Sequence, residues 1–200
     1  MANIDAAFGY RPIGKVGSGV NNAGTTLYTI GDNYGTAIFK GDHVMQSGGL
    51  VIAGTASGAT NLGVFNGCFY IDPTSKKPTW SNYYPASTNV TSSGSISGGT
   101  TIDAYIYDDP YTLFEAQCDG TIAKTDIGKN TDSVLGTSST VNGLSVTEID
   151  SGSEATTAGL QVKIIGISKD PENDDASSAN ANWYVMFNEH VKLGTGVTGT

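Results

Sequence analysis

The sequence predicts an all-β protein, a β-barrel or sandwich with an extended N-terminal arm and at most one or two short helices. Short apolar runs are separated by turn signals at a spacing of roughly 8–12 residues, which is typical of barrels and sandwiches. Glycine is abundant, with 27 among 200 residues, and charged residues make up only 14% of the chain. An average soluble domain is about 25% charged, so this composition favours a turn-rich β protein with a neutral, polar surface.

The clearest strand pattern surrounds the polar corner Asp108-Asp109-Pro110. Before the corner, buried and outward positions are expected to alternate through Ile102, Asp103, Ala104, Tyr105, Ile106 and Tyr107. After it, the same alternation runs through Leu113, Phe114, Glu115, Ala116, Gln117 and Cys118. Successive side chains of a strand point to opposite faces, so each run is expected to be half-buried. Pro110 cannot donate to a ladder, and the corner therefore joins two strands.

The chain is expected to divide into an arm, one domain and a tail. Residues 1–24 carry little regular pattern, and we expect an extended arm there rather than a core strand. Residues 25–193 are expected to form a single β-rich domain. Residues 194–200 are expected to be a loose tail, as chain ends usually are.

Three features interrupt the strand pattern inside this domain. Gly63 and Gly67 break an apolar run and are expected to be bulges or bends. Residues 73–100 form an irregular excursion that contains three prolines and ends in a Ser/Thr/Gly-rich run. Residues 121–128 are the best candidate for a short helix, with Gly128 as its stop.

The charge is distributed unevenly along the chain. Residues 1–100 carry four Asp, no Glu, four Lys and one Arg, a net of +1; residues 101–200 carry ten Asp, five Glu and five Lys, a net of −10, and together they give −9. The acidic half argues against direct nucleic-acid binding, because phosphate contacts need clustered Lys and Arg. Two interpretations stay open. The acidity only maintains solubility, or the near-neutral half docks on a partner while the acidic half faces water.

No targeting signal and no membrane-spanning run is visible in the sequence. The N-terminus lacks a basic region followed by an apolar run, and no stretch approaches the ~20 apolar residues that cross a bilayer. We therefore expect no membrane partner and synthesis in a cytosol, where Cys68 and Cys118 stay thiols. A pairing of the two cysteines is the alternative.

The motifs of known enzymes are either incomplete or absent in this sequence. We therefore expect neither enzymatic activity nor a cofactor. Residues 9–15 have the spacing of a phosphate-binding loop, but Val16 stands where a Ser or Thr must reach Mg²⁺. The sequence has no Gly-x-Ser-x-Gly elbow. His43 and His190 lie beside strand residues without the local signature of a catalytic triad.

Calcium binding is the alternative with most support among cofactor hypotheses. Four acidic residues cluster near the C-terminus and offer hard oxygen ligands: Asp170, Glu172, Asp174 and Asp175. A Ca²⁺-dependent hydrolase or lectin would use them in this way. Their spacing does not match the Asp-x-Asp-x-Asp-Gly loop, so the main expectation is a solvated turn that holds no metal.

Several blocks of sequence, taken together and in order, carry a resemblance to a known family. They are residues 1–12 (MANIDAAFGYRP), 108–110 (DDP), 114–117 (FEAQ), Gly120, 165–166 (IG), 170–173 (DPEN), 182–183 (NW) and 188–190 (NEH). As a set, the blocks resemble small virion proteins of tailed bacteriophages, many of them marine. Residues 73–100 match nothing in that pattern.

The resemblance implies a capsid decoration (cement) protein, a structural virion component without catalysis. Such a protein is made in the host cytoplasm, sits on the outer capsid surface at junctions between capsomers, and stabilises the shell. Its partners would be the major capsid protein and further copies of itself, commonly as a homotrimer. Candidate shell or subunit contacts are Phe8, Tyr10, Arg11 and Pro12 in the arm, and Tyr105, Tyr107 and Glu115 near the corner.

A second function is compatible with the same kind of virion. Trp80, Tyr83 and Tyr84 stud the excursion at residues 73–100. If exposed together, these aromatic rings would form a platform on which sugars stack. The chain would then be a tail or fibre component that binds host glycans. The other interpretation, which we prefer, is that the three rings cap the core.

Overall fold

The structure, a computed structural model, describes residues 3–17, 19–20, 24–90, 102–171, 173, 178–194 and 196–200. These residues confirm an all-β fold, in which no helix is long and apolar enough to cross a membrane. The strands are β1 (Arg11–Lys15), β2 (Thr26–Ile30), β3 (Ile38–Phe39), β4 (His43–Ser47), β5 (Leu50–Ala53), β6 (Gly63–Ile71), β7 (Pro78–Ser81), β8 (Tyr83–Tyr84), β9 (Ile102–Tyr107), β10 (Thr112–Gln117), β11 (Asn130–Thr131), β12 (Ser133–Val134), β13 (Glu148–Ile149), β14 (Val162–Ile167) and β15 (Asn182–Phe187).

One half of the molecule, which we call the barrel lobe, is a small closed barrel. Strands β4, β5, β2, β9 and β6 pair in that order, and β6 pairs again with β4 to close the ring. All these pairings are antiparallel except β2 with β5. β7 extends the sheet beyond β6, and β3 and β8 form a separate two-stranded ladder. Closure leaves the five barrel strands without a free edge that could pair with other chains.

The barrel core follows from the alternation seen in the sequence. On β9, Ile102, Ala104 and Ile106 are fully buried, while Asp103, Tyr105 and Tyr107 on the other face are partly exposed. The remaining side chains of this core are Ile30, Ile38, Val44, Val51, Leu62, Phe65, Cys68, Tyr70, Tyr84 and Val90. Burial of such apolar side chains is the main favourable term in folding.

Gly67 is a bulge, as its place in the apolar run predicts. The register of β6 against β9 shifts between Phe65 and Gly67. A β-carbon on Gly67 would lie 2.6 Å from Cζ2 of Trp80, so the indole rests directly on the bare backbone. Gly63, at the start of β6, is equally crowded by the Tyr107 carbonyl oxygen, 2.2 Å from where its β-carbon would be.

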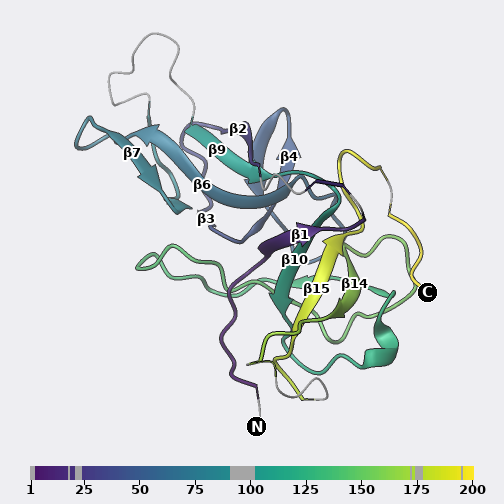
Figure 1. Ribbon diagram of the computed structural model, residues 1–200. Helices are drawn as coiled ribbons and strands as arrows, with labels where there is room; N and C mark the ends of the chain where they lie inside the picture. The colour runs from purple at the N-terminus through teal and green to yellow at the C-terminus, as the bar shows by residue number, and fades with distance from the viewer. Residues whose placement is uncertain are drawn as a thin grey trace.

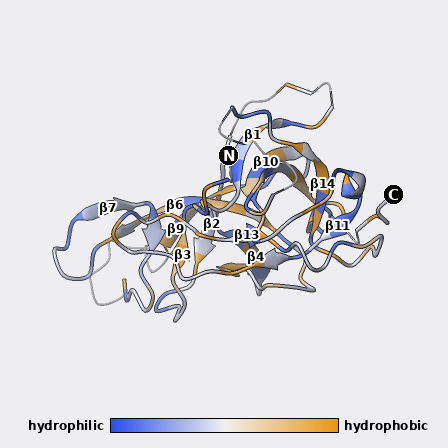
Figure 2. Cartoon of the chain, turned by 90° about the horizontal axis from the view of Figure 1, so that it is seen from below, coloured by the Kyte–Doolittle hydropathy of each residue, from blue (hydrophilic) through white to orange (hydrophobic). Residues whose placement is uncertain are grey.

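The other half, the sheet lobe, is an open five-stranded antiparallel sheet in the order β1-β10-β15-β14-β11. Figure 1 shows the two lobes side by side, and Figure 2 shows apolar residues on strands of both. The core of the sheet lobe contains Tyr10, Val64, Phe114, Ala116, Cys118, Ile122, Ile149, Val162, Ile164, Ala181, Trp183, Val185 and Phe187. Val64 belongs to the barrel strand β6, so the two cores meet at this point.

The corner Asp108-Asp109-Pro110 is where the chain passes from one lobe to the other. β9, before it, belongs to the barrel, and β10, after it, is the second strand of the five-stranded sheet. The two strands expected from the sequence are therefore present, but they lie in different sheets. The corner is therefore a connection between two sheets and not the turn of a hairpin.

The expected arm at residues 1–24 is not irregular throughout, because part of it pairs as an edge strand of the sheet lobe. Residues 11–15 form β1, which pairs with β10 from Arg11 opposite Glu115 to Lys15 opposite Thr112. The strand lacks clean alternation because its register shifts between Pro12 and Gly14. Pro12 is tolerated because β1 is an edge strand, where a missing N–H is least costly.

The helix expected at residues 121–128 shrinks to a single 3-10 turn, Lys124–Asp126. Ile122 is buried in the sheet-lobe core, whereas Ile127 is 41% exposed, so the two do not share a buried face. Gly128 has a φ of +95°, and the turn ends just before it. Three residues are too few to form an α-helical turn with its own hydrogen-bonded ladder.

The expectation of a loose tail is wrong for the part that the structure describes, residues 196–200. The Val197 backbone N–H donates to Asn188, and its carbonyl accepts from the Asn130 side chain at 2.8 Å. The backbone N–H of Thr200 donates to Gly128. These hydrogen bonds fasten the C-terminal segment along the sheet lobe.

Candidate functional site

The N-terminal residues 3–8, which we call the strap, lie extended along the surface of the sheet lobe. The buried side chain of Gln117, on β10, holds them. Its amide nitrogen donates to the Ile4 carbonyl at 2.9 Å, and its oxygen accepts from the Ala6 N–H at 2.9 Å. One amide thus satisfies two backbone groups spaced two residues apart, as a neighbouring strand would. Asn3 adds a hydrogen bond to the Ala179 carbonyl.

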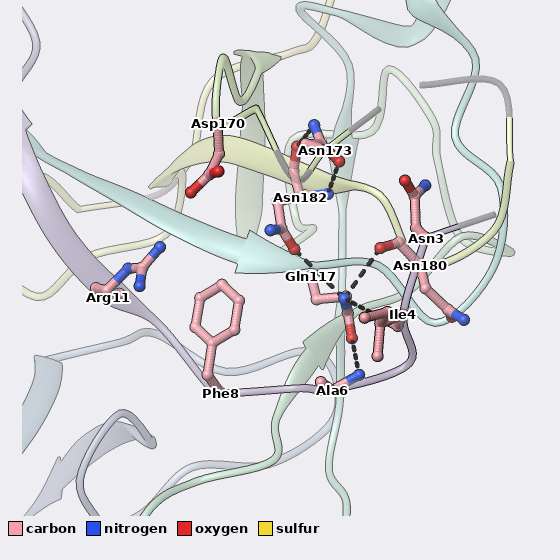
Figure 3. Close-up of a pocket in the computed structure, with 10 residues that line it drawn as sticks. All are labelled: Asn3, Ile4, Ala6, Phe8, Arg11, Gln117, Asp170, Asn173, Asn180 and Asn182. Carbon is pink, nitrogen blue, oxygen red and sulfur yellow. Dashed lines mark hydrogen bonds between the residues drawn. The ribbon is translucent and has the colours of Figure 1, made fainter. Parts of the chain in front are cut away.

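A polar cavity of about 240 Å³ lies beneath the strap. Figure 3 shows Gln117 at its centre, with Phe8 and Arg11 to one side and a group of asparagines to the other. Its lining is rich in amides: Asn3, Gln117, Asn173, Asn180 and Asn182, together with Ile4, Ala6, Phe8, Arg11 and Asp170. Because Ile4 is 78% exposed, the strap covers this cavity without packing tightly into it.

Arg11 connects the strap to a buried carboxylate. Its guanidinium lies over the Phe8 ring at 4.7 Å and forms an ion pair with Glu115, the residue opposite it on β10. The Glu115 side chain also accepts a hydrogen bond from Ser168 and is only 4% exposed. A charge this deeply buried needs such partners. Glu115 is therefore engaged within its own subunit rather than free for the neighbour contact that the sequence predicted.

An apolar cleft of about 230 Å³ lies on the other side of Phe8, between β1 and the barrel lobe. The sequence-predicted contacts Phe8, Tyr10, Arg11, Pro12 and Tyr107 all line it. Its other walls are Lys40, Gly41, Val64, Phe65 and Leu144. The structure thus brings five of the seven predicted contact residues to one place, and Arg11 links a sixth, Glu115, to it.

Tyr10 belongs to the core more than to the surface. It is 1% exposed, its ring packs against those of Phe114 and Phe187, and its hydroxyl lies 2.6 Å from the Ser133 hydroxyl. Burial raises the pKa of this phenol well above its usual range. Only a small part of the ring reaches the cleft, so Tyr10 cannot supply much contact area to a partner.

Tyr105 and Tyr107, both on β9, do not act as a pair. Tyr107 packs against the sheet-lobe core and lines the apolar cleft. Tyr105 lies on the barrel surface, with its ring 5.0 Å from that of Trp80. The two side chains therefore belong to separate surfaces, one at the junction of the lobes and one on the barrel.

The acidic corner ties several segments together. Asp108 accepts hydrogen bonds from Thr26 at 2.7 Å and Tyr28 at 2.6 Å on β2, and from Lys192 near the C-terminus. Burial alone would raise the pKa of Asp108, but these donors outweigh it and lower the pKa below its ordinary value. Asp109 pairs with Lys15 of β1, and this hydrogen bond lowers its pKa too. Both carboxylates serve as structural anchors.

Only one of the four acidic residues proposed as calcium ligands belongs to the described part of the chain. Asp170 is exposed and lines the polar cavity, whereas Glu172, Asp174 and Asp175 lie outside the described residues. Among the residues that the structure describes, no group of three or more His, Cys, Asp or Glu side chains is placed to hold a metal ion. The described residues therefore show no arrangement of side chains that supports calcium binding.

Buried histidines and cysteines occupy structural positions. Burial lowers the pKa of His43, whose Nε2 lies 2.9 Å from the Thr55 carbonyl, and burial also lowers the pKa of His190. Cys68 and Cys118 are free thiols in different cores, which confirms the expectation of thiols. Burial raises the pKa of Cys68 to about 12, so it is protonated at neutral pH.

The three aromatics proposed as a sugar platform do not assemble. Tyr84 is fully buried in the barrel core, and Tyr83 stacks on Phe39 with ring centroids 5.5 Å apart. Trp80 alone is well exposed, at 49%, and its neighbour is Tyr105. The expectation of capping thus fits Tyr84, and a platform, if one is used, would be built by Trp80 and Tyr105.

Sequence reasoning missed the residues that organise this site, chiefly Gln117 and Lys40. Gln117 occurs in one of the resembling blocks, but nothing in a single glutamine shows that it will meet a segment 111 residues away. Lys40 precedes Gly41, whose φ of +98° is one that favours glycine. Only the folded structure shows that Lys40 lies at the apolar cleft.

Comparison with known proteins gives no relative: no family model, no curated protein and no solved structure matches this chain.

Proposed function

We propose that this chain is a structural phage virion protein that decorates and stabilises the outer capsid shell, as a cement protein does. The blocks of sequence that resemble such proteins motivate the proposal. Its partners would be the major capsid protein and further copies of this chain, and its place the outer surface of the virion.

The observation that best supports the proposal is the strap. Residues 3–8 lie extended on the surface, and within the described residues the hydrogen bonds that tether them come mainly from Gln117 and Asn3. Ile4 is 78% exposed, and Asp5 beside it is exposed as well. An extended segment that offers apolar and polar groups to solvent is suited to clamping a neighbouring protein, because it can add contacts without refolding the domain.

Deletion of residues 1–7 tests this role. Deletion as far as residue 12 would also remove the buried Tyr10 and the start of β1, and so would disturb the sheet lobe as well as the strap. The shorter deletion keeps Tyr10 and β1. We expect the truncated protein to bind heads that lack this protein at clearly lower occupancy than the full chain, measured by co-sedimentation at equal concentrations. Equal occupancy would exclude the strap as the shell contact.

A second candidate function, glycan binding by a tail or fibre component, has one observation in its favour. The Trp80 indole is in close contact with Gly67, is 49% exposed, and lies beside the Tyr105 ring. Flat aromatic faces bind the apolar face of sugars. A glycan array on the purified chain separates the two functions: a cement protein gives no signal, whereas a glycan-binding protein gives a signal that Trp80→Ala abolishes.

A further inference from the structure

The apolar cleft is open to water at one wall. Leu144, at its rim, is 41% exposed, and the rest of the lining is mostly aromatic or aliphatic, including Phe8, Tyr107 and Val64. Water in such a cleft contacts apolar surface that an apolar side chain of a partner would cover, and that burial favours association.

A cation stands at the rim of this cleft. The backbone of Lys40 is fixed by hydrogen bonds to Gly143 and Ser145 of the neighbouring loop, so its side chain starts from a rigid position. Lys40 is exposed, and its ammonium forms no ion pair with any residue that the structure describes. The cleft therefore suits an apolar side chain that has a carboxylate next to it.

The chain itself carries one segment of that kind. Among the described residues, the most exposed large apolar side chains are Ile4 at 78%, Val20 at 87%, Val141 at 95% and Val197 at 67%. Only Ile4 has an acidic neighbour in sequence, Asp5. The other three stand between glycine, threonine and asparagine residues.

The electrostatic surroundings of Asp5 favour the same pairing. Burial raises the pKa of Glu148, and the charges of Asp5 and Asp119 raise it further, so Asp5 lies close enough to Glu148 for the two carboxylates to repel each other. A cation from a neighbouring molecule would relieve this repulsion. Within its own copy, Gln117 holds Ile4 at the mouth of the polar cavity, and Ile4 does not line the apolar cleft.

We propose that the strap of one copy docks in the apolar cleft of a second copy, with Ile4 between Phe8, Tyr107 and Leu144 and Asp5 against Lys40. Made once between two copies, such a contact is heterologous; made reciprocally, with each strap in the other copy's cleft, it gives a two-fold symmetric dimer. A heterologous contact repeats from copy to copy and closes into a ring when the rotation allows it. The contact is self-association of this chain and holds whether or not the protein binds a capsid.

A charge swap tests the pairing on the purified full chain, with no phage heads present. Sedimentation velocity between about 1 and 100 µM measures self-association in a range suited to micromolar affinity. Asp5→Lys and Lys40→Glu should each weaken association about two- to fivefold, as expected for a partly exposed ion pair. The double variant, Asp5→Lys with Lys40→Glu, should restore it, because the two charges are then exchanged.

Substitution of the apolar side chain of Ile4 is expected to weaken self-association more than the charge reversals do. Ile4→Ser should weaken association about tenfold or more, as expected when a largely buried aliphatic side chain is lost. Val141→Ser and Lys77→Glu are matched controls, because both residues are exposed and neither lines the cleft. Thermal unfolding of each variant verifies that the fold is intact.

Two results would overturn the proposal. One is a wild-type chain that stays monomeric over the whole concentration range. The other is an oligomer that Ile4→Ser and the single charge reversals leave unchanged. Equal head occupancy in the deletion experiment above would count against the shell-binding role and would leave the self-association measured here unchanged, so failure of that function and failure of this contact can be told apart.

Discussion

Single polar side chains, buried between distant segments, decide how the parts of this chain are held together. Tyr10 bonds to Ser133, Gln117 bonds to the strap, and Asp108 collects donors from β2 and from Lys192. Each buried polar group would be costly without its partner, because desolvation is then uncompensated. Substitution of these residues therefore has effects whose size can be anticipated.

Tyr10→Phe keeps the ring in the core and removes only the hydroxyl. Ser133, 2% exposed, then loses its partner, and we expect the free energy of unfolding to fall by about 1 to 2 kcal/mol. Urea denaturation of the two proteins measures the difference. Tyr10→Ala removes the whole ring and should cost about 3–5 kcal/mol. Phe8→Ala is the control and should cost less, because the Phe8 side chain is only half-buried. Similar small losses for both alanine variants would show that Tyr10 is not a core residue.

His43 makes stability depend on pH on the acidic side of neutrality. Its pKa in the folded chain is lowered by burial from an ordinary value of 6.5, so the unfolded chain binds the proton more readily. The stabilisation is present above about pH 6.5 and is lost as the pH falls towards the folded pKa. Denaturation at several pH values should show a slope of at most about 1.4 kcal/mol per pH unit from this residue.

His43→Gln isolates that contribution. The variant cannot take up a proton at this position, so its unfolding free energy should change less between pH 6.5 and pH 5 than that of the wild type. The comparison uses the difference between the two slopes, because Glu148 and Asp132 have raised pKa values and act in the opposite direction. Parallel pH profiles would contradict the assignment.

At the scale of elements, the sequence predicted the strands whose buried and exposed residues alternate. It missed the segments that are ordered only by pairing with distant parts of the chain. β9 was predictable because its inward residues Ile102, Ala104 and Ile106 are all apolar. β1 was missed because Pro12 and a register shift hide its pattern, and it becomes a strand only through β10. The five-residue segment 196–200 looked loose because its hydrogen-bonding partners, such as Asn130 and Gly128, are more than sixty residues distant.

The same reason limits how much of the candidate site was predictable. Phe8 and Pro12 were grouped as candidate contacts through the family resemblance, and the structure places both at the apolar cleft. Gln117 and Lys40 could not be recognised, because a buried glutamine and an exposed lysine carry no local signal of what they will face. Tyr83 and Tyr84, next to each other in sequence, point to different environments because adjacent residues of a strand face opposite sides.

The strap should detach when Gln117 is replaced. Gln117→Ala removes both hydrogen bonds to Ile4 and Ala6, and we expect faster amide exchange at Ala6 and earlier proteolysis within residues 3–8. The exchange rates of the β10 and β15 amides should change little. An unchanged exchange rate at Ala6 would show that other contacts hold the strap.

Gly67 should be required for the position of Trp80. In Gly67→Ala, the new β-carbon would lie 2.6 Å from the indole, at a backbone φ of +152°, so the ring must move and the bulge is strained. We expect a loss of about 1–3 kcal/mol in stability. The tryptophan emission should shift through Trp80 alone, because Trp183 is fully buried in the other lobe. Emission identical to that of the wild type would contradict this packing.

At the scale of the whole molecule, a near-neutral and an acidic part are joined at one corner. Most of the barrel lobe comes from the first half of the sequence, with a net charge of +1, and most of the sheet lobe from the second half, with −10. Asp108 and Asp109 hold the passage between the lobes through Tyr28, Lys15 and Lys192.

Electron cryo-microscopy of the intact particle tests the central proposal most directly. If the chain is a decoration protein, its two-lobed density lies on the outer surface of the shell, and residues 3–8 contact the major capsid protein or a neighbouring copy. Density for the chain on the tail or a fibre, or a shell without it in a particle that contains the protein, would contradict the proposal.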